Sequence, residues 1–256
     1  MLAVRWVGIK IMLRGTPVED RPSNDLLRRL SAQDYELLAP HLERVDLPSN
    51  KVLYHPGEDV HTVFFPCETS AASFMVTIED GRDVQTVLVG HEGAVGGIIS
   101  HGFSPAFSRI VVLFGGPFVQ MPIRQLELAQ TQSRSLNHLF ARYADCMLAQ
   151  CFQSIACNAV HTIEQRAAKW LIAAMRRAKT NMIPVTHEHF ALMLGVGRSY
   201  ASRIILEFKA ERIVETRRGA LIIADEAALE RKSCACNEAV DGHFRDVLQG
   251  VYFDRS

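Results

Sequence analysis

The sequence predicts an α+β fold with a β-rich N-terminal domain, a long helix, and a C-terminal helical domain that carries a β-hairpin. Three observations support it. Short runs of β-branched and aromatic residues, separated by Gly and Pro, fill the segment from about 45 to 121. A stripe of apolar residues at helical spacing follows. Two short helical patterns joined by a glycine turn then occupy residues 186–208.

The N-terminal third begins with two short predicted helices and continues as strands. Asn24 or Ser23 caps a helix over 25–30, and Ser31 caps a second over 31–42. The predicted strands are Val52–Tyr54, Thr62–Phe65, Ser73–Thr77, Val84–Val89 and Arg109–Phe114. Asp80-Gly81 between two of these runs is a hairpin signal. Many short strands with regular turns indicate a small barrel or sandwich.

The long helix carries one apolar stripe over about 25 residues, or about 38 Å. A helix of that length extends beyond a barrel of this size, so the stripe is interpreted as a coiled-coil-like dimer seam. A core helix within one domain is the alternative. The seam residues are Leu136, Phe140, Tyr143, Met147, Cys151 and Ile155.

The next segment has the pattern of a helix-turn-helix. Thr162 and Gln165 form a capping box for a helix over 163–179. Thr186 caps a helix over 187–194, Gly195 ends it, and a second helix begins near Arg198. Four apolar positions of this second helix are expected to face inward: Ala201, Ile204, Ile205 and Phe208.

The outward face of the second helix suits double-stranded DNA. Arg198 and Arg203 can each bind guanine bidentately from the major groove. Hydroxyl groups beside them suit phosphates or base edges, and these belong to Ser199, Tyr200 and Ser202. The helix start at Thr186 adds free backbone amides for a phosphate. Strands over 212–216 and 220–223 form a wing, whose turn carries Arg217 and Arg218.

Charge distribution agrees with this interpretation although the formal net charge is zero. Residues 161–220 carry 11 Lys and Arg against 5 Asp and Glu, a net charge of +6 between two acidic segments. No apolar run is long enough for a membrane span and no signal peptide is recognised, so a cytoplasmic protein with no membrane partner is expected. No nucleophile elbow, phosphate loop or metal-binding helix appears, so the chain is not expected to be an enzyme.

The segment from Val185 to Arg198, with its Leu194-Gly195-Val196 core and Arg203 five positions later, resembles the cyclic-AMP-receptor and fumarate-nitrate-reduction (Crp/Fnr) family of transcription regulators. The resemblance implies five parts: an N-terminal extension (1–24), a cyclic-nucleotide-binding-like β-roll (25–132), a dimerisation helix (133–160), a winged helix-turn-helix (161–230) and a C-terminal tail (231–256). It implies a homodimer on a pseudo-palindromic operator, with RNA polymerase as a further partner. Ser199 stands where many members carry an acidic residue, and Arg212 replaces a common glycine.

The effector region departs from the pattern of members that bind cyclic nucleotides. Gly97 stands where the family has a glutamate for the ribose, and Arg109 is displaced from the phosphate-binding position. Cyclic AMP is therefore not expected to bind. An anion site made by Gly96, Gly97, Ser108 and Arg109 remains as an alternative to an ordinary β-roll turn.

The six cysteines do not follow the family's iron–sulfur pattern either, because the first of them is Cys67. The pair Cys234 and Cys236 offers two sulfurs, too few for a four-ligand site. No cofactor and no metal are predicted. The alternative function is a small-ligand or redox sensor that acts through protein contacts and carries a vestigial helix-turn-helix.

Overall fold

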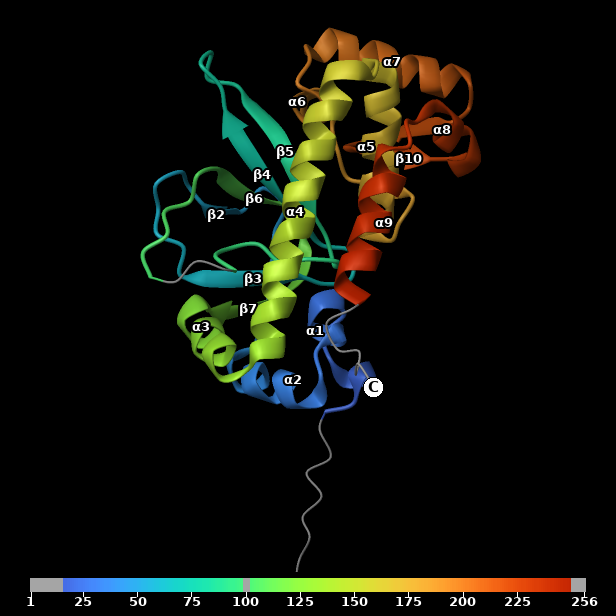
Figure 1. The fold of residues 1–256 in the computed structure, drawn as a ribbon. Helices are drawn as coiled ribbons and strands as arrows, with labels where there is room; N and C mark the ends of the chain where they lie inside the picture. The colour runs from blue at the N-terminus through green and yellow to red at the C-terminus, as the bar shows by residue number, and fades with distance from the viewer. Residues whose placement is uncertain (1–15, 99–101, 250–256) are drawn as a thin grey trace, which may run out of the picture.

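The computed structural model describes residues 16–98 and 102–249 (Figure 1). Most of the predicted extension 1–24 lies outside these residues. The chain forms a two-sheet β-roll with short helices below it, a long helix along one side, and a helical C-terminal domain above. This is the predicted fold class, which is confirmed.

The N-terminal helices are anchored to the β-roll through one asparagine. Asn24 accepts hydrogen bonds from the backbone amides of Leu26 and Leu27, and its own amide donates to the carbonyls of Pro66 (2.9 Å) and Gly93 (2.8 Å). Because every polar atom of this buried side chain is used, the first helix has a fixed position on the roll. The elements are η1 (Val18–Asp20), α1 (Asp25–Arg29), α2 (Ala32–Leu38) and η2 (Ala39–His41).

The β-roll consists of two antiparallel sheets with strand orders β1-β7-β3 and β2-β6-β4-β5. The five predicted strands are present, and Asp80-Gly81 turns between β4 and β5 as predicted, with Gly81 at φ 80°. Sequence analysis missed β1 and β7. The bounds are β1 (Glu43–Leu47), β2 (Val52–Tyr54), β3 (Thr62–Pro66), β4 (Ala71–Thr77), β5 (Asp83–Val89), β6 (Arg109–Phe114) and β7 (Gly116–Pro122).

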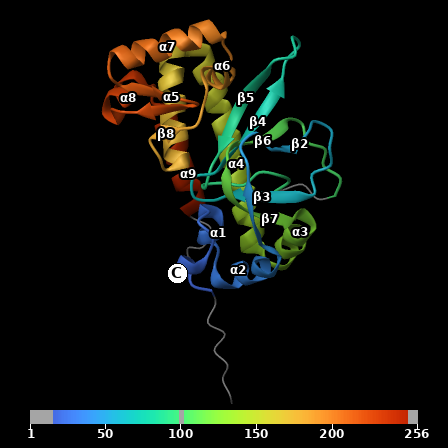
Figure 2. The same cartoon turned by 180° about the vertical axis from the view of Figure 1, so that it is seen from behind.

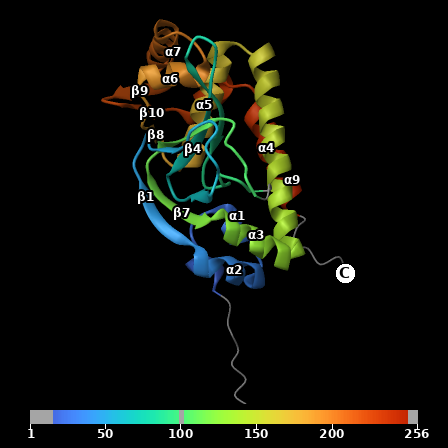
Figure 3. The same ribbon diagram turned by 90° about the vertical axis from the view of Figure 1, so that its left-hand side faces the viewer.

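A short helix, α3 (Ile123–Gln132), leads into the long helix α4 (Arg134–Val160). Ser133 caps α4 by accepting a hydrogen bond from the amide of Leu136 (3.1 Å). With 27 residues α4 is about 40 Å long. It runs along one edge of the molecule, as the side view shows (Figure 3). The predicted long helix over 133–160 is thus present, beginning one residue later than predicted and ending at the same residue.

The C-terminal domain contains helices α5 (Ile163–Ala178), α6 (His187–Leu194), α7 (Arg198–Ala210) and α8 (Glu226–Lys232) around a small sheet. The sheet has the order β8-β10-β9 and is made of β8 (Met182–Ile183), β10 (Ala220–Ile223) and β9 (Val214–Arg217). The predicted capping box of Thr162 and Gln165 is confirmed. None of the helices in the described ranges is long and apolar enough to cross a membrane.

The segment named a tail in the sequence analysis is largely helical. Helix α9 (Cys236–Gln249) folds back along α4, as both the front and rear views show (Figures 1 and 2). Phe244 of α9 packs edge-on against Tyr143 of α4, and Arg142 donates to the carbonyl of Val247 (2.8 Å). One side of α4 is therefore covered by its own chain.

The C-terminal domain and the β-roll share one hydrophobic core. Met75, Leu88 and Phe114 of the roll are buried with Trp170 and Phe190 of the C-terminal domain. The two parts are thus packed against each other through a common core.

Candidate nucleic-acid interface and effector cavity

The two helices of the candidate interface are joined as predicted. Thr186 accepts a hydrogen bond from the amide of His189 (3.2 Å), which caps α6. Gly195 ends α6 at φ 67°, in the left-handed region that favours glycine. The four predicted inward residues of α7 are all buried: Ala201, Ile204, Ile205 and Phe208. The opposite face of α7 consequently points to solvent.

That exposed face carries the predicted base-reading residues. Arg198, Ser199, Tyr200 and Arg203 are all exposed, and the Arg203 side chain retains 61% of its accessible surface. The Arg203 guanidinium lies 4.4 Å above the Tyr200 ring, and its Nε is 4.0 Å from a carboxylate oxygen of Glu207. Exposed contacts of this kind are weak, so Arg203 can leave them for a stronger acceptor.

Ser202 has a different environment from its neighbours. It is half-buried, and its hydroxyl is hydrogen-bonded to Nδ1 of His187 (3.0 Å). This contact joins α7 to the first turn of α6. Ser202 therefore has a partner within the protein that its sequence pattern did not reveal.

A depression of about 360 Å³ lies between the start of α6, the start of α7 and the β9–β10 hairpin. Thr186, Arg198 and Arg217 line it, and Glu188 is the acidic residue among its walls. The structure thus brings together three predicted DNA-binding residues from three separate elements. Two guanidinium groups beside a helix N-terminus make a suitable environment for a phosphate.

The wing is shorter than predicted. β9 begins at Val214 rather than at Arg212, because Arg212 has a φ of 59° and cannot pair in a strand. Arg217 belongs to β9, opposite Ala220, so the turn consists of Arg218 and Gly219. Arg217 and Arg218 are both exposed at this end of the hairpin.

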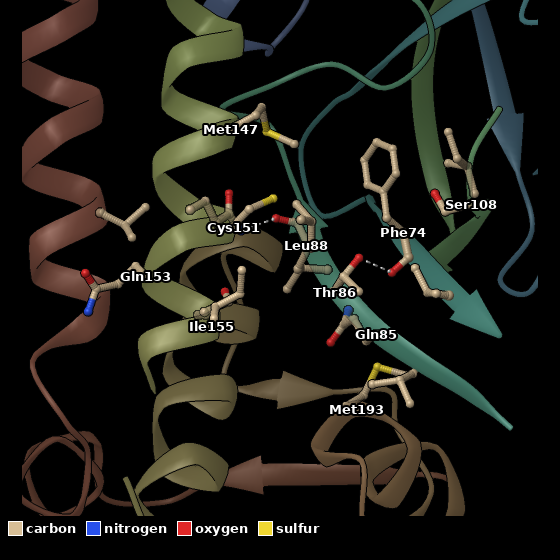
Figure 4. Close-up of a pocket in the computed structure, with 18 of the residues that line it drawn as sticks. Phe74, Gln85, Thr86, Leu88, Ser108, Met147, Cys151, Gln153, Ile155 and Met193 are labelled. Atoms are coloured by element: carbon tan, nitrogen blue, oxygen red, sulfur yellow. Dashed lines mark hydrogen bonds between the residues drawn. The ribbon is translucent and has the colours of Figure 1, made fainter. Parts of the chain in front are cut away.

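A cavity of about 850 Å³ lies between the β-roll, α4 and α5 (Figure 4). Its β-roll and α4 walls are mainly apolar, and Phe74, Met147 and Cys151 face it from both sides. Burial raises the pKa of the Cys151 thiol, so this sulfur is neutral. The described lining residues from the β-roll and α4 include no Lys or Arg.

The structure separates the four residues of the predicted anion site. Gly96, Gly97 and Ser108 line the cavity, but Arg109 does not. The Arg109 guanidinium instead forms an ion pair with Asp83 of β5, which is separated from β6 by strand β4. The prediction is wrong for Arg109, because its ion pair with Asp83 holds the guanidinium away from the cavity that the other three residues line. A side chain at Gly97 would also meet Ile123, whose Cδ1 would lie 2.4 Å from the added Cβ.

The basic residues that line the cavity come from α5, and two of them are already held by a hydrogen bond or an ion pair within the protein. Arg166 donates to the carbonyl of Leu194 (2.8 Å), and Arg177 pairs with Glu92 (2.7 Å). Burial lowers the pKa of the Arg166 guanidinium from its ordinary value. Lys169 lines the same end of the cavity. A ligand's anionic group would therefore meet positive charge near α5 and apolar surface near the β-roll.

Comparison with known proteins identifies the C-terminal part of the chain. The family described as "Crp-like helix-turn-helix domain" matches residues 165–232. Residues 165–232 are a Crp-like helix-turn-helix domain. This Crp-like domain contains α5 to α8 and the wing, and the identification agrees with the resemblance seen in the sequence.

The fold of about three quarters of the chain matches several solved structures. FixK2 from Bradyrhizobium japonicum has a TM-score of 0.63 at 14% identity, covering 76% of this chain and 98% of its own. The c-di-GMP-responsive regulator CLP of Xanthomonas campestris has a TM-score of 0.59 at 16% identity, covering 76% and 100%. A putative Crp/Fnr-family regulator from Eubacterium rectale has a TM-score of 0.58 at 18% identity, covering 81% and 96%. The search of curated proteins found no match. The chain thus has the fold of the Crp/Fnr regulators.

The packing of α4, the long helix that precedes the Crp-like domain, contradicts most of the predicted dimer seam. Leu136, Phe140 and Tyr143 are buried within their own chain, packed against the N-terminal helices and the β-roll. Met147 and Cys151 are half-buried and line the cavity. The seam is therefore wrong for these five residues, since helical periodicity marks an apolar face without showing what covers it.

Only the last predicted seam residue, Ile155, is strongly exposed, at 67%. Leu148 and Phe152 accompany it on the same face of α4, with exposures of 53% and 65%. Their spacing of four and three residues makes a continuous apolar stripe. Leu148 and Phe152 were not among the predicted seam residues, although the sequence places them four and three positions apart in a run that ends at Ile155.

Contacts between the β-roll and the Crp-like domain were also missed. Trp170 donates from its ring nitrogen to Gln85, and Arg177 is held by Glu92. In the sequence Arg177 is one of several basic residues that favour DNA binding. Because its side chain is buried in an ion pair, it contributes to domain packing instead.

Proposed function

We propose that the chain is a sequence-specific DNA-binding transcription regulator that acts as a homodimer on a pseudo-palindromic operator. The observation that carries this proposal is the exposed N-terminal half of α7, where Arg198 and Arg203 point away from a fully packed helix-turn-helix core. A recognition helix enters the major groove with these first turns. The Crp-like identity of residues 165–232 supports the same role.

The surroundings of α7 supply contacts to the DNA backbone. The depression lined by Thr186, Arg198 and Arg217 is placed to receive a phosphate beside the recognition helix. Arg218 at the wing turn is exposed and reaches further along the duplex. We infer that Arg198 contacts both the bases and the DNA backbone, since it belongs to α7 and also lines the depression.

The homodimer is proposed to form through α4. The apolar stripe of Leu148, Phe152 and Ile155 is exposed, and Ile155 at its end also lines the cavity. Pairing two such helices would bury this stripe and place two Crp-like domains next to each other. An apolar stripe at helical spacing that protein packing leaves exposed is a typical helix–helix interface.

A selection of bound fragments from a sheared genomic library, followed by sequencing, tests the function directly. We expect a motif with two half-sites about one helical turn apart, and an affinity that falls steeply with salt. Lack of enrichment, or binding that is insensitive to salt, would contradict the proposal. The expected contact with RNA polymerase and the cytoplasmic location stay predictions.

The cavity favours a second element of the function, which is control by a small ligand that is mainly apolar. Its walls from the β-roll and α4 offer Phe74, Met147 and Cys151 rather than charged groups. A cyclic nucleotide is not the ligand we propose, because Arg109 is paired with Asp83 and Gly97 provides no carboxylate. Calorimetry with cyclic AMP should give no heat beyond dilution, and saturable binding would refute this part.

A further inference from the structure

Three cysteines and one histidine meet where the end of α4 faces the segment between α8 and α9. Cys157 lies in the last turn of α4 and His161 follows that helix directly. Cys234 and Cys236 come from the start of α9 and the residues before it. The four ligand atoms all lie within 4.8 Å of one another. The sequence offered only Cys234 and Cys236, too few for a four-ligand metal site. The fold adds Cys157 and His161 as two further potential metal ligands.

The spacing of Cys157 and His161 explains how α4 contributes two donors. Residues four apart lie on the same face of a helix, one turn from each other. The amide of His161 donates the last hydrogen bond of the helix to the carbonyl of Cys157 (3.0 Å), although the backbone of His161 is itself extended (φ −98°, ψ 146°). Cys234 lies two residues before Cys236, the first residue of α9, and both sulfurs lie within 4.8 Å of the ligand atoms of Cys157 and His161.

The site is enclosed by protein. Cys157, Cys234 and Cys236 are buried, with exposures of 0%, 7% and 4%, and together they form a small separate cluster. His161 is half-buried. Three buried thiols have little to gain from one another as hydrogen-bonding partners, since S–H is a weak donor and sulfur a weak acceptor.

The measured separations do not fit a disulfide. Sγ of Cys157 lies 3.7 Å from Sγ of Cys234, whereas a disulfide bond is about 2.05 Å long. All six cysteines are free thiols in this structure. The two sulfurs are therefore in contact without being bonded to each other.

Two of the separations match those between ligands of a tetrahedral zinc ion, and all four ligand atoms lie within 4.8 Å of one another. With Zn–S bonds of about 2.3 Å and a Zn–N bond of about 2.0 Å, tetrahedral ligand atoms lie about 3.5–3.8 Å apart. The Cys157–Cys234 sulfur separation is 3.7 Å, and Sγ of Cys236 is 3.7 Å from Nδ1 of His161. We propose that Cys157, His161, Cys234 and Cys236 form a structural zinc site of the Cys3His type.

The donor set selects zinc over other metals. Thiolate and imidazole ligands in a closed four-coordinate arrangement are typical of structural zinc, whereas magnesium and calcium require oxygen ligands. An iron–sulfur cluster places several metal atoms between its ligands, so it needs a wider separation than 4.8 Å across the whole set.

The groups around the site suit a metal-bound thiolate. The Gln153 side-chain amide donates to Sγ of Cys236 (3.1 Å), a contact that would orient this ligand and stabilise its charge. Three thiolates and one zinc ion leave a net charge of −1. Arg166 is close enough to Cys157 to interact with it electrostatically, so it offsets that charge.

The position of the ion would connect three parts of the chain. His161 is the single residue between the end of α4 and Thr162, the cap of α5. A metal held there would join the long helix, the entrance of the Crp-like domain and the start of α9, which lies along α4 in Figure 1. It would fix the direction in which the Crp-like domain leaves α4.

The first test uses the full-length protein purified under reducing conditions without chelators. We expect one zinc ion per chain by elemental analysis. After zinc removal, titration with Co²⁺ should give the visible bands of a tetrahedral site and the near-ultraviolet bands of cobalt–thiolate bonds. Zinc added afterwards should abolish both. Removal of the metal should lower the Tm, and stoichiometric Zn²⁺ should restore it.

Matched variants then assign the ligands. Cys236→Ser and Cys157→Ser should each reduce the bound zinc and the cobalt–thiolate intensity. Cys151→Ser is the control, because this half-buried cysteine lies on α4 six residues before Cys157 but outside the cluster. His161→Cys should retain the metal and increase the cobalt–thiolate intensity. Gln153→Leu should weaken zinc binding by about 10- to 100-fold.

The results that would contradict the zinc site can be distinguished from one another. Full-length protein that contains no zinc, and whose reduced form takes up neither Zn²⁺ nor Co²⁺, overturns the proposal without any variant. Iron with acid-labile sulfide would replace zinc by a cluster. A disulfide between Cys157 and Cys234 that survives reduction and excludes Zn²⁺ would also overturn it. None of these measurements depends on whether the protein binds DNA.

Discussion

Arg177 and Glu92 form an ion pair across the boundary between the Crp-like domain and the β-roll, with Nε and Oε1 2.7 Å apart. The side chains are only 12% and 21% exposed. Both oxygens of the Glu92 carboxylate also accept from the amide of Gly90 (3.1 Å each). Glu92 therefore holds a β-roll loop and helix α5 at the same time.

Arg177→Met should destabilise the protein, because it leaves the Glu92 carboxylate buried without its partner. We expect a loss of about 2 kcal/mol in the free energy of unfolding, less than for a fully buried pair since both groups keep some solvent contact. Urea denaturation measures it. The control Arg176→Met removes the neighbouring, more exposed arginine and should cost less than half as much. Equal losses from both variants would show that the pair has no special role.

The two arginines Arg203 and Arg218 should contribute to DNA binding in different ways. Arg203→Ala should lose about 1–3 kcal/mol of discrimination between the operator and a mutated site, since this residue is proposed to read a base. Arg218→Ala should weaken binding to all sequences and reduce the salt slope by about 1. Titrations at several salt concentrations measure both effects.

Lys209→Ala is the matched control for these arginines, because it removes one positive charge from the exposed far end of α7. It should change neither the discrimination nor the salt slope beyond a small long-range effect. If Arg203→Ala and Arg218→Ala gave the same pattern, the division into base-reading and phosphate-binding roles would be wrong.

Phe152→Glu should convert the dimer to monomers. The substitution places a charge in the middle of the exposed apolar stripe of α4, where pairing would have to bury it without a partner. Sedimentation equilibrium should show a much weaker association, and operator binding should weaken with it. Ile78→Glu, an equally apolar exposed position beside the β4–β5 turn, should remain dimeric. A Phe152→Glu protein that stays dimeric would exclude this face of α4.

Arg212→Gly should stabilise the protein. Arg212 has a φ of 59°, where a side chain costs about 1 kcal/mol and glycine does not. Glycine also loses more entropy on folding, so we expect a net gain of about 0.5 kcal/mol with DNA binding unchanged. Thermal and urea denaturation measure it, and a decrease in Tm would contradict the prediction. Gly219→Ala is the control with the opposite expected sign. Gly219 has a φ of 75°, so adding a side chain there should make the protein less stable.

Local patterns predicted the recognition elements well. The bounds of α6 and the first residue of α7 follow from Thr186 and Gly195, whose capping preferences act within one helical turn. The hairpin at Asp80-Gly81 is equally local. β1 and β7 were missed because their pairing partners, and not their own composition, define them as strands.

The sequence by itself determined the order of the elements, the helix-turn-helix and the arginines Arg198 and Arg203 on its outer face, because periodicity and capping are set by residues a few positions apart. Tertiary structure alone decided which side of α4 stays exposed, why Arg109 leaves the cavity, and how Cys157 and His161 come to face Cys234 and Cys236. Those facts depend on contacts between residues that are distant in the sequence, for example the 26 positions that separate Asp83 from Arg109. No periodicity records such contacts, since only the folded chain brings the partners together.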